Sequence, residues 1–369
     1  MKNICYIISG IDKALAFEWI SELLDKNRYK IFFVLLHTYK GGLEEYFIQN
    51  EIDHIRFQYK NKSDLFITIY KIRSYLLNQK IDIVHCHLLD AGLAGVISAK
   101  LAGIQKIIYT RHHSTYHHTY FKKGVLYDKI INYFSTQIVA VSKNVKDVLI
   151  KKEGVKAEKI KVNHHGFPLE LFDVVLPENI LNLKAKYHFS GKSPVIGVVS
   201  RYEEWKGIQY IIPAFKNLIE RKPNAHLVLA NARGSYTAQL KSMLETLPKD
   251  SYTEIEFEDD LFTLFKTFDI FVHTPVDNQS EAFGQVYVEA MAAGIPCIFT
   301  LSGIGSEIAI DRVNSLVVPY KDSNAINSVI NLLLSNPTLR NSLQENSIIS
   351  VKKNFSLQEM LTNLNELYA

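Results

Sequence analysis

Two glutamates stand eight residues apart in the segment of this sequence with the clearest chemical character. The segment Ser280–Pro296 reads SEAFGQVYVEAMAAGIP, with polar residues and Gly284 near its start and a predicted helix that continues to Ala293. Backbone N–H groups at such a helix start can hold anions or the polar edges of a ligand. Glu281 precedes the helix and Glu289 lies one to two turns inside it, so the two carboxylates can approach one ligand from different directions.

Each glutamate also has a structural alternative. Glu281 can simply cap the helix. Glu289 stands among Val286, Val288 and Ala290, where an unpaired carboxylate is unfavourable, so a buried arginine is an alternative partner for it. We favour the ligand-binding interpretation for both carboxylates.

A pair of cations forms the second candidate site. Arg201 and Lys206 stand five residues apart in a loop that follows a predicted strand and ends at Gly207 before a helix. Arginine offers a bidentate fork and lysine a point charge, and both suit phosphoryl oxygens. The two can therefore converge on one diphosphate, although a solvated loop with incidental charges is the alternative.

Paired histidines raise the question of a metal. His85 and His87 form a His-x-His pair, and two adjacent pairs follow at residues 117–118 and 164–165. No acidic residue stands near them at ligand spacing in the sequence, and no His-Glu-x-x-His motif occurs. We therefore expect no metal and no cofactor.

The elements that must position these residues alternate between strand and helix. Short runs rich in Ile and Val suit a parallel sheet that is covered on both faces. The predicted strands are Ile4–Ser9, Ile31–Leu36, Ile83–His85, Lys106–Thr110 and Gln137–Val141, then Val195–Ser200, His226–Ala230, Ile270–His273, Pro296–Thr300 and Ser315–Val318. Helical periodicity occurs in Ala16–Leu24, Phe66–Leu77, Ala91–Leu101, Ile208–Glu220 and Ala325–Leu334. This alternation predicts the doubly wound α/β class, in which ligands bind beyond the carboxyl ends of the strands.

Length and composition predict two domains. The chain has 369 residues, 47% of them hydrophobic and 22% charged, which is enough for two cores. The stretch 163–193 is the expected linker. Residues 1–170 carry 25 Lys and Arg against 16 Asp and Glu, whereas residues 171–369 carry 17 against 22, so the halves are expected to bind different partners.

The same features exclude some classes of protein. The basic charges are scattered and no helix-turn-helix, RRM or KH pattern occurs, so nucleic acid is not an expected partner. Cys5, Cys86 and Cys297 form no CxxC pair, which fits a reducing compartment. The N-terminus shows no cleavage-site pattern and no apolar run is long enough to span a bilayer. We expect a cytoplasmic protein.

One segment allows contact with a membrane surface. The run Tyr116–Phe134 mixes aromatic and aliphatic residues with Lys122, Lys123 and Lys129. Basic and aromatic residues together are what an interfacial helix needs to rest on anionic lipid. An amphipathic helix that docks on its own sheet is an equally open interpretation.

Several of these motifs, in this order, resemble glycosyltransferase family 4. That family comprises retaining, nucleotide-sugar-dependent transferases of the GT-B fold, with two Rossmann-like domains that face each other across a cleft. The resemblance covers essentially the whole chain. It rests on the Glu281-to-Glu289 segment with EAMAAGIPCI, the Arg201/Lys206-Gly207 loop, Val139–Ser142, the SGIGSEI stretch from Ser302 with Asn314–Val318 after it, and NFSLQEM near the end.

The resemblance implies a division of labour between the domains. Residues 1–170, with a closing helix at about 355–369, would bind the acceptor, and residues 171–354 would bind the nucleotide sugar. Arg201 and Lys206 would neutralise the leaving diphosphate, and Glu281 would contact the donor sugar. Glu289 would bind the ribose hydroxyls. The donor would also lie near Phe283, Gly284, Gln285 and Val286.

The resemblance implies three further residues in the N-terminal domain. A family histidine that follows the fourth strand as Thr-x-His matches His112, with His113 as the one-residue alternative. Because side-chain direction reverses at each step of a strand, only one of the two is expected to face the cleft. The family's first loop often carries Gly-Gly, and here it reads SGIDK, so Gly10 and Asp12 are candidates for the acceptor side.

We therefore expect a glycosyltransferase that moves a sugar from a nucleotide-sugar donor, such as a UDP-sugar, to a glycan or lipid-linked acceptor. Cell-surface polysaccharide or lipopolysaccharide synthesis is the expected setting, at the inner face of the plasma membrane. Two alternatives remain open. One is a GT-B UDP-sugar epimerase. The other is a catalytically silent nucleotide- or glycan-binding subunit of a polysaccharide assembly complex.

Overall fold

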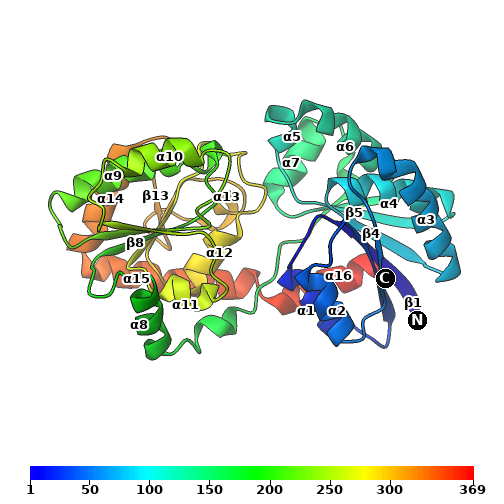
Figure 1. Cartoon of the computed structure of the whole chain (residues 1–369), viewed down its shortest axis with the longest axis horizontal. Helices are drawn as coiled ribbons and strands as arrows, with labels where there is room; N and C mark the ends of the chain where they lie inside the picture. The colour runs from blue at the N-terminus through cyan, green and yellow to red at the C-terminus, as the bar shows by residue number, and fades with distance from the viewer. The chain divides into compact units, whose positions relative to one another are not determined.

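The computed structural model describes all residues from 1 to 369 and divides them into two compact units (Figure 1). The first unit comprises Met1–Gly166 and Leu357–Ala369, and the second comprises Phe167–Ser356. Each unit contains one parallel sheet with helices packed against it. Each therefore has the helix-covered parallel sheet that the alternation of strands and helices predicts.

The first unit is built on seven parallel strands in the order β3-β2-β1-β4-β5-β6-β7. The strand order runs outward from β1 in both directions, as in doubly wound folds. Because all seven strands are parallel, their carboxyl ends lie at one edge of the sheet. Its strands are β1 (Lys2–Ser9), β2 (Tyr29–Leu36), β3 (His54–Phe57), β4 (Ile83–His87), β5 (Lys106–Arg111), β6 (Gln137–Ala140) and β7 (Ile160–Val162). Its helices are α1 (Leu15–Leu23), α2 (Gly42–Gln49), α3 (Leu65–Asn78), α4 (Leu89–Leu101), α5 (Tyr116–Thr119), α6 (Lys122–Phe134), α7 (Lys143–Lys151) and α16 (Leu357–Tyr368).

The last helix of the chain completes the core of the first unit. Helix α16 buries Met360, Leu361 and Leu364 in the cluster that contains the side chains of β1 and β2. At its end the Tyr368 hydroxyl lies 2.6 Å from His85 Nδ1, and Lys2 Nζ donates to the Ala369 carbonyl at 2.7 Å. Residues more than 280 positions apart in sequence therefore share one core.

The second unit is built on six parallel strands in the order β10-β9-β8-β11-β12-β13. Its strands are β8 (Val195–Val199), β9 (His226–Ala230), β10 (Tyr252–Ile255), β11 (Ile270–His273), β12 (Cys297–Phe299) and β13 (Leu316–Val317). Its helices are α8 (Pro177–Lys186), α9 (Ile208–Ile219), α10 (Thr237–Leu244), α11 (Leu261–Lys266), α12 (Gln285–Ala292), α13 (Gly305–Ile308), α14 (Ser323–Ser335) and α15 (Pro337–Asn354). The carboxyl ends of β8, β11 and β12 meet at one edge of the sheet, where the predicted donor residues follow them.

The segment 116–134, which we expected to form one amphipathic helix, forms two. Helix α5 ends at Thr119 and α6 begins at Lys122, with Phe121 outside helical geometry at φ −139°. The turn places the His117 and Phe121 rings over Gly124, where a Cβ atom would stand 2.7 Å from His117 Cγ and 2.6 Å from Phe121 Cδ1. A glycine at 124 thus allows α5 to fold back on α6, which places His117 beside Asp128.

Candidate active site

A lysine, a glutamate and a histidine meet at the carboxyl edge of the second unit's sheet. Lys206 Nζ lies 2.5 Å from Glu281 Oε1, and His273 Nε2 lies 3.1 Å from the same oxygen. Glu281 and His273 are buried, with side-chain exposed fractions of 6% and 1%, and Lys206 is partly buried, with 14%. The geometry therefore joins the two predicted donor segments through a histidine at the end of β11.

A glycine allows the Lys206 loop to approach β11. Gly207 has φ +78°, and a Cβ atom there would stand 1.8 Å from the backbone oxygen of Thr274. Only a residue without a side chain fits both the left-handed backbone and this close approach. Gly207 therefore holds Lys206 against the residues that follow β11.

The electrostatics of this cluster keep Glu281 ionised. Burial alone would raise the pKa of its carboxyl group, but the Lys206 ammonium and the hydrogen bond from His273 lower it to about 2. Burial lowers the pKa of His273, so at neutral pH the ring is neutral and its Nε2–H donates to the carboxylate. His273 Nδ1 is buried and has no hydrogen-bond partner.

Arg201 lies in a different environment from Lys206. Its side chain is 60% exposed, and its guanidinium stands 3.9 Å from the Glu203 carboxylate. Lys206 by contrast is committed to Glu281 and also lies 4.3 Å from the centre of the Trp205 ring. Of the two predicted phosphate-binding cations, Arg201 is thus the one whose charge faces solvent.

Helix α12 begins at the carboxyl edge of the sheet. Gly284 precedes it in a left-handed conformation at φ +83°, and Gln285 and Val286 form its first turn. The first N–H groups of a helix have no intrahelical partner, so this turn offers donors to an anion. The Phe283 carbonyl is already used, since it accepts from Ile304 N at 2.7 Å.

Glu289, unlike Glu281, has no partner and a raised carboxyl pKa. It lies in the second turn of α12, is partly buried, and has no ion pair or hydrogen bond, so the buried arginine considered as its alternative partner is not present. Burial raises the pKa of this carboxyl group to about 7. One segment therefore carries a paired, ionised glutamate and an unpaired one that titrates near neutral pH.

The two candidate histidines of the first unit contact different partners. His112 Nε2 lies 2.9 Å from His87 Nδ1, and the His112 ring stacks on His165 with centroids 5.7 Å apart. Burial lowers the pKa of His112 well below its ordinary value, so this ring is neutral at physiological pH. His113 instead lies 3.1 Å from Asp128 Oδ2.

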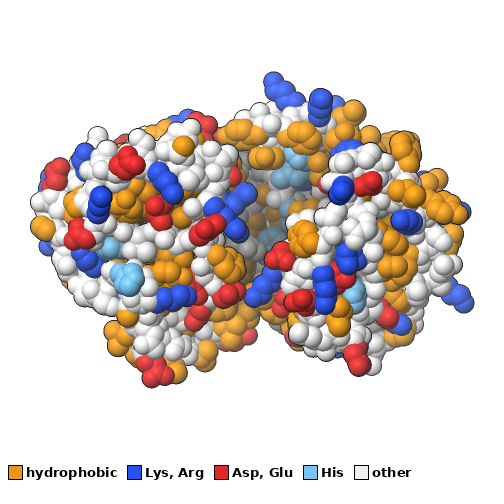
Figure 2. Space-filling view, in the orientation of Figure 1, with side chains coloured by type: hydrophobic (Ala, Val, Ile, Leu, Met, Phe, Trp, Pro, Cys, Tyr) orange, Lys and Arg blue, Asp and Glu red, His pale blue; other side chains and the backbone are white.

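The His113 side chain belongs to a buried polar network that sequence reasoning missed. Arg111, only 1% exposed, donates to Asp128 at 2.9 Å and also bonds to Glu153. His117 Nδ1 lies 2.6 Å from the same Asp128 oxygen. Burial lowers the pKa of His113 to about 4, while hydrogen bonds from His113 and His117 outweigh burial and lower the pKa of Asp128. Figure 2 shows histidine side chains gathered in this unit.

The first loop holds the start of α2. Asp12 Oδ1 accepts from Gly42 N at 3.0 Å, and its carbonyl accepts from Leu43 N at 2.7 Å. Gly10 adopts φ +62° directly after β1, where a side chain would meet no neighbouring atom. Both residues lie at the carboxyl edge of the sheet, beyond the strand that precedes them.

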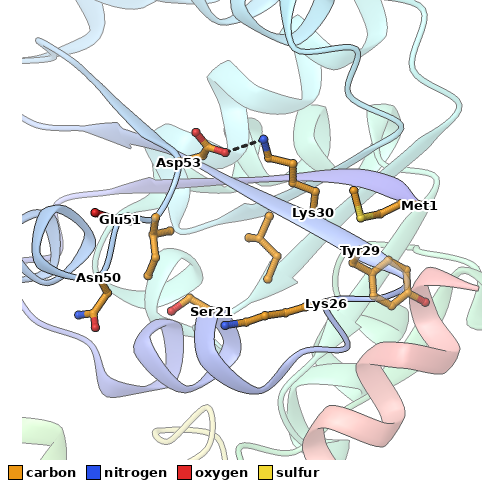
Figure 3. Close-up of a pocket in the computed structure, with 10 residues that line it drawn as sticks. Met1, Ser21, Lys26, Tyr29, Lys30, Asn50, Glu51 and Asp53 are labelled. Atoms are coloured by element: carbon orange, nitrogen blue, oxygen red, sulfur yellow. Dashed lines mark ion pairs between the residues drawn. The ribbon is translucent and has the colours of Figure 1, made fainter.

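A pocket of about 350 Å³ lies elsewhere in the first unit (Figure 3). Its lining includes Tyr29 and Lys30 at the start of β2 and Asp53 just before β3, and Lys30 Nζ forms an ion pair with Asp53 at 2.9 Å. These residues mark the amino ends of the strands. Ligands of doubly wound sheets bind at the opposite edge, so this pocket is not the candidate active site.

Two family models match the chain. The model of the glycosyl transferases group 1 matches residues 179–349, and the model of glycosyltransferase family 4 matches residues 20–171. Together they contain all of the candidate residues except those of the first loop.

Curated relatives and solved structures agree with the family models. The chain is 27% identical to the capsular polysaccharide biosynthesis glycosyltransferase CapM of Staphylococcus aureus, over 86% of this chain and 85% of CapM. It is 26% identical to an α-1,3-galactosyltransferase of Escherichia coli that acts on GlcNAc-diphosphoundecaprenol, over 82% of this chain and 78% of that enzyme. The crystal structure of Anabaena HepE with UDP-glucose matches with a TM-score of 0.85 at 20% identity, over 100% of this chain and 99% of HepE.

These likenesses confirm the expected fold and family. The HepE match, at its low identity, concerns the fold alone, which is GT-B with two Rossmann-like domains. No helix in the structure combines the length and the apolar composition that a membrane span requires. The chain belongs to the family 4 glycosyltransferases, with a family 4 domain followed by a group 1 domain.

Proposed function

We propose that this enzyme is a retaining transferase that takes a sugar from a nucleotide-sugar donor bound by the second unit. The observation that carries the proposal is the contrast between its two glutamates. Glu281 is held ionised by Lys206 and His273, whereas Glu289 is unpaired and titrates near neutral pH. An unpaired carboxylate in the second turn of α12 is suited to accept hydrogen bonds from the two hydroxyls of a ribose.

The donor's diphosphate would be bound by Arg201, Lys206 and the first turn of α12. Arg201 is exposed and can direct its guanidinium fork to phosphoryl oxygens, and Lys206 adds a point charge. Gly284, Gln285 and Val286 would supply backbone N–H donors. These groups stabilise the negative charge that develops on the leaving diphosphate, which is the main catalytic contribution we assign to this chain.

No metal is needed for that step in this proposal. The chain lacks an Asp-x-Asp pair, and two cations with a helix N-terminus supply the positive charge that a divalent ion would otherwise contribute. The departing phosphate would take the acceptor proton on the same face of the sugar, which retains the anomeric configuration. His112, neutral and oriented by His87, would contact the sugar, with Gly10 and Asp12 on the acceptor side.

A UDP-sugar is the donor class that we propose. The E. coli relative is named as a UDP-galactose enzyme, and the HepE structures contain UDP or UDP-glucose. CapM is named for capsular polysaccharide biosynthesis, and the galactosyltransferase is named for an acceptor linked to diphosphoundecaprenol. We therefore propose a glycan or lipid-linked acceptor and a place of action at the cytoplasmic face of the membrane.

Membrane contact would be made by α5 and α6. The buried face of α6 includes Gly124 and Asp128, while Leu126 and Tyr133 on its other face are 63% and 79% exposed. Lys122, Lys123 and Lys129 are exposed on the same helix. Exposed apolar and basic side chains together fit an anionic lipid surface.

A thermal-shift panel of UDP-, GDP-, ADP- and CMP-sugars tests the proposal. A ligand at 100 times its Kd stabilises the native state by about 2.7 kcal/mol, which gives a measurable rise in Tm. We expect UDP-sugars to shift the wild type and not Glu289→Ala, while Glu220→Ala, at an exposed position of the same unit, serves as the matched control. Binding without transfer to any acceptor would favour the silent subunit, and sugar interconversion without an acceptor would favour the epimerase.

A further inference from the structure

Three metal-ligating side chains converge in the first unit, outside the residues that the transfer reaction uses. One ligand atom each from His113, His117 and Asp128 lies within 4.8 Å of the other two. The Asp128 side chain is fully buried and that of His117 is 7% exposed. The two histidines come from the turn after β5 and from α5, and Asp128 comes from α6.

The spacing of these atoms is close to that of a metal site. Zinc binds histidine nitrogen at about 2.0–2.1 Å and carboxylate oxygen at about 2.0–2.2 Å, so tetrahedral ligand atoms stand about 3.3 Å apart. His113 Nε2 is 3.1 Å from Asp128 Oδ2, and His117 Nδ1 is 2.6 Å from it. The two separations to Asp128 are slightly shorter than the tetrahedral value and the two nitrogens lie within 4.8 Å of each other, so side-chain adjustment can place all three atoms at bonding distance from one ion.

Hydrogen bonds alone leave the cluster incompletely satisfied. His113 Nε2 contacts both Arg111 Nη1 and Asp128 Oδ2, yet one ring nitrogen can either accept from the first or donate to the second. Asp128 Oδ1 is buried and has no hydrogen-bond partner at all. A metal ion resolves the conflict at His113 Nε2, because it accepts the nitrogen lone pair, and it also satisfies Asp128 Oδ1 when the carboxylate binds through both of its oxygens.

The buried carboxylates of the cluster outnumber its arginine, which favours binding of a cation. Asp128 and Glu153 are two fully buried carboxylates, and Arg111 is the one arginine that pairs with both. An uncompensated buried negative charge is unfavourable, so a further positive charge is required, either a metal or a proton on a histidine. Arg111 Nη1 contacts both His113 Nε2 and Asp128 Oδ2, so an ion bound by these two atoms displaces the guanidinium toward Glu153, with which Arg111 is already paired.

We propose that His113, His117 and Asp128 bind a divalent transition metal of the zinc class. Two imidazoles and one carboxylate are donors that suit Zn²⁺, with Fe²⁺ as a related occupant of the same donor set. The ion ties the turn after β5 to α5 and α6, and so fixes the backbone next to His112. It is a structural ion, separate from the residues that bind the donor.

Metal content decides the proposal. The full chain, purified without chelator or stripped with dipicolinate and reloaded with Zn²⁺, is desalted and measured by inductively coupled plasma mass spectrometry. We expect about one metal ion per chain and a rise in Tm on reloading. A Co²⁺-loaded sample is expected to show the visible absorption of tetrahedral cobalt. Less than about 0.1 ion per chain in both preparations overturns the proposal.

Two variants assign the ligands. Removing a residue that only hydrogen-bonds to a metal ligand lowers metal affinity by about 10–100-fold. His117→Gln removes a ligand itself, so it is expected to lower metal affinity by at least that factor. His118→Gln is the matched control, because His118 stands next in the same helix and bonds to Glu153 instead. Equal metal content in both variants places the ion elsewhere and overturns the assignment. The wild-type Co²⁺ spectrum decides the question even if His117→Gln does not fold.

Discussion

The buried pair of Lys206 and Glu281 makes a prediction in which the pH dependence of stability changes sign. In the wild type, the carboxyl pKa of Glu281 falls from 4.5 to about 2 on folding, which corresponds to about 3 kcal/mol of stability. A lowered pKa contributes stability that is present above pH 4.5 and is lost as the pH falls toward 2. Acidification below pH 4.5 is therefore expected to destabilise the second unit.

Lys206→Met removes the ammonium and leaves the carboxylate buried. Loss of one partner of a buried pair destabilises by about 3–5 kcal/mol, and the 14% exposure of Lys206 places the expected loss near the lower value. Burial, which raises the pKa of Glu281, is then no longer opposed by the Lys206 ammonium, and His273 still opposes it. The folded variant takes up a proton on the pair formed by Glu281 and His273, which titrates as one system. Its stability is therefore expected to rise as the pH falls from 8 to 5.

Urea unfolding between pH 4 and pH 8 measures this effect. Trp19 and Trp205 are the two tryptophans of the chain, so a Trp19→Phe background lets the fluorescence of Trp205 report on the second unit alone. Lys216→Met, at an exposed position on α9, is the matched control and is expected to behave like the wild type. Adding Glu281→Gln to Lys206→Met is expected to abolish the reversed pH slope.

The reasoning is refuted if Lys206→Met loses less than about 0.5 kcal/mol at pH 7, which is the range of ordinary surface substitutions. It is also refuted if the variant keeps the wild-type direction of its pH dependence. Either result means that Glu281 reaches water when its partner is absent, and that the carboxylate is not held by this pair.

Four other substitutions test the donor site, the loop and the membrane surface. Because the pKa of Glu289 is about 7, donor affinity measured by calorimetry is expected to rise from pH 6 to pH 8, with release of a proton on binding. This pH dependence should vanish in Glu289→Gln, and an unchanged pH dependence would assign the proton to another group. Arg201→Gln is expected to weaken donor binding by about 1.5–3 kcal/mol with Tm unchanged, since the side chain is exposed; a fall in Tm without a loss of affinity would contradict the phosphate role. Gly207→Ala is expected to lower the free energy of unfolding of the second unit by more than about 1 kcal/mol, because residue 207 has φ +78° and its new Cβ would meet the Thr274 backbone oxygen. Unchanged urea unfolding would contradict this and would mean that the loop relaxes around the new side chain. Leu126→Glu is expected to reduce flotation with anionic vesicles and not transfer to a water-soluble acceptor, and undiminished flotation would remove α6 from the membrane contact.

The strands that the sequence pattern did not reveal are all at the edges of sheets. β3 and β7 are the two outer strands of the first sheet, and β10 is an outer strand of the second. An edge strand has one neighbour and is covered less completely, so it lacks the continuous apolar run that marks a central parallel strand. β3 is only half-buried along its whole length, whereas β8 is buried at every position.

The donor segment was readable because its parts are close in sequence. Glu281 and Glu289 lie on either side of a helix start, and helical geometry alone relates residues a few positions apart. The pattern of buried strands likewise depends on local composition, which is why the α/β class and the family resemblance followed from the sequence. The structure then showed that Glu289 has no internal partner, a fact that depends on every side chain around it.

The remaining contacts depended on the order of strands in each sheet. Lys206 lies 75 positions before Glu281 and His273 lies 8 positions before it, yet only the adjacency of β8 and β11 brings the three together. Asp128 is beside His113 and His117 because α5 folds back on α6 at Gly124, and no spacing rule for metal ligands contains that turn. The sequence by itself determined the fold class and the local donor motif through short-range periodicity, whereas tertiary packing decided which titratable groups share a buried volume and therefore which of them are charged.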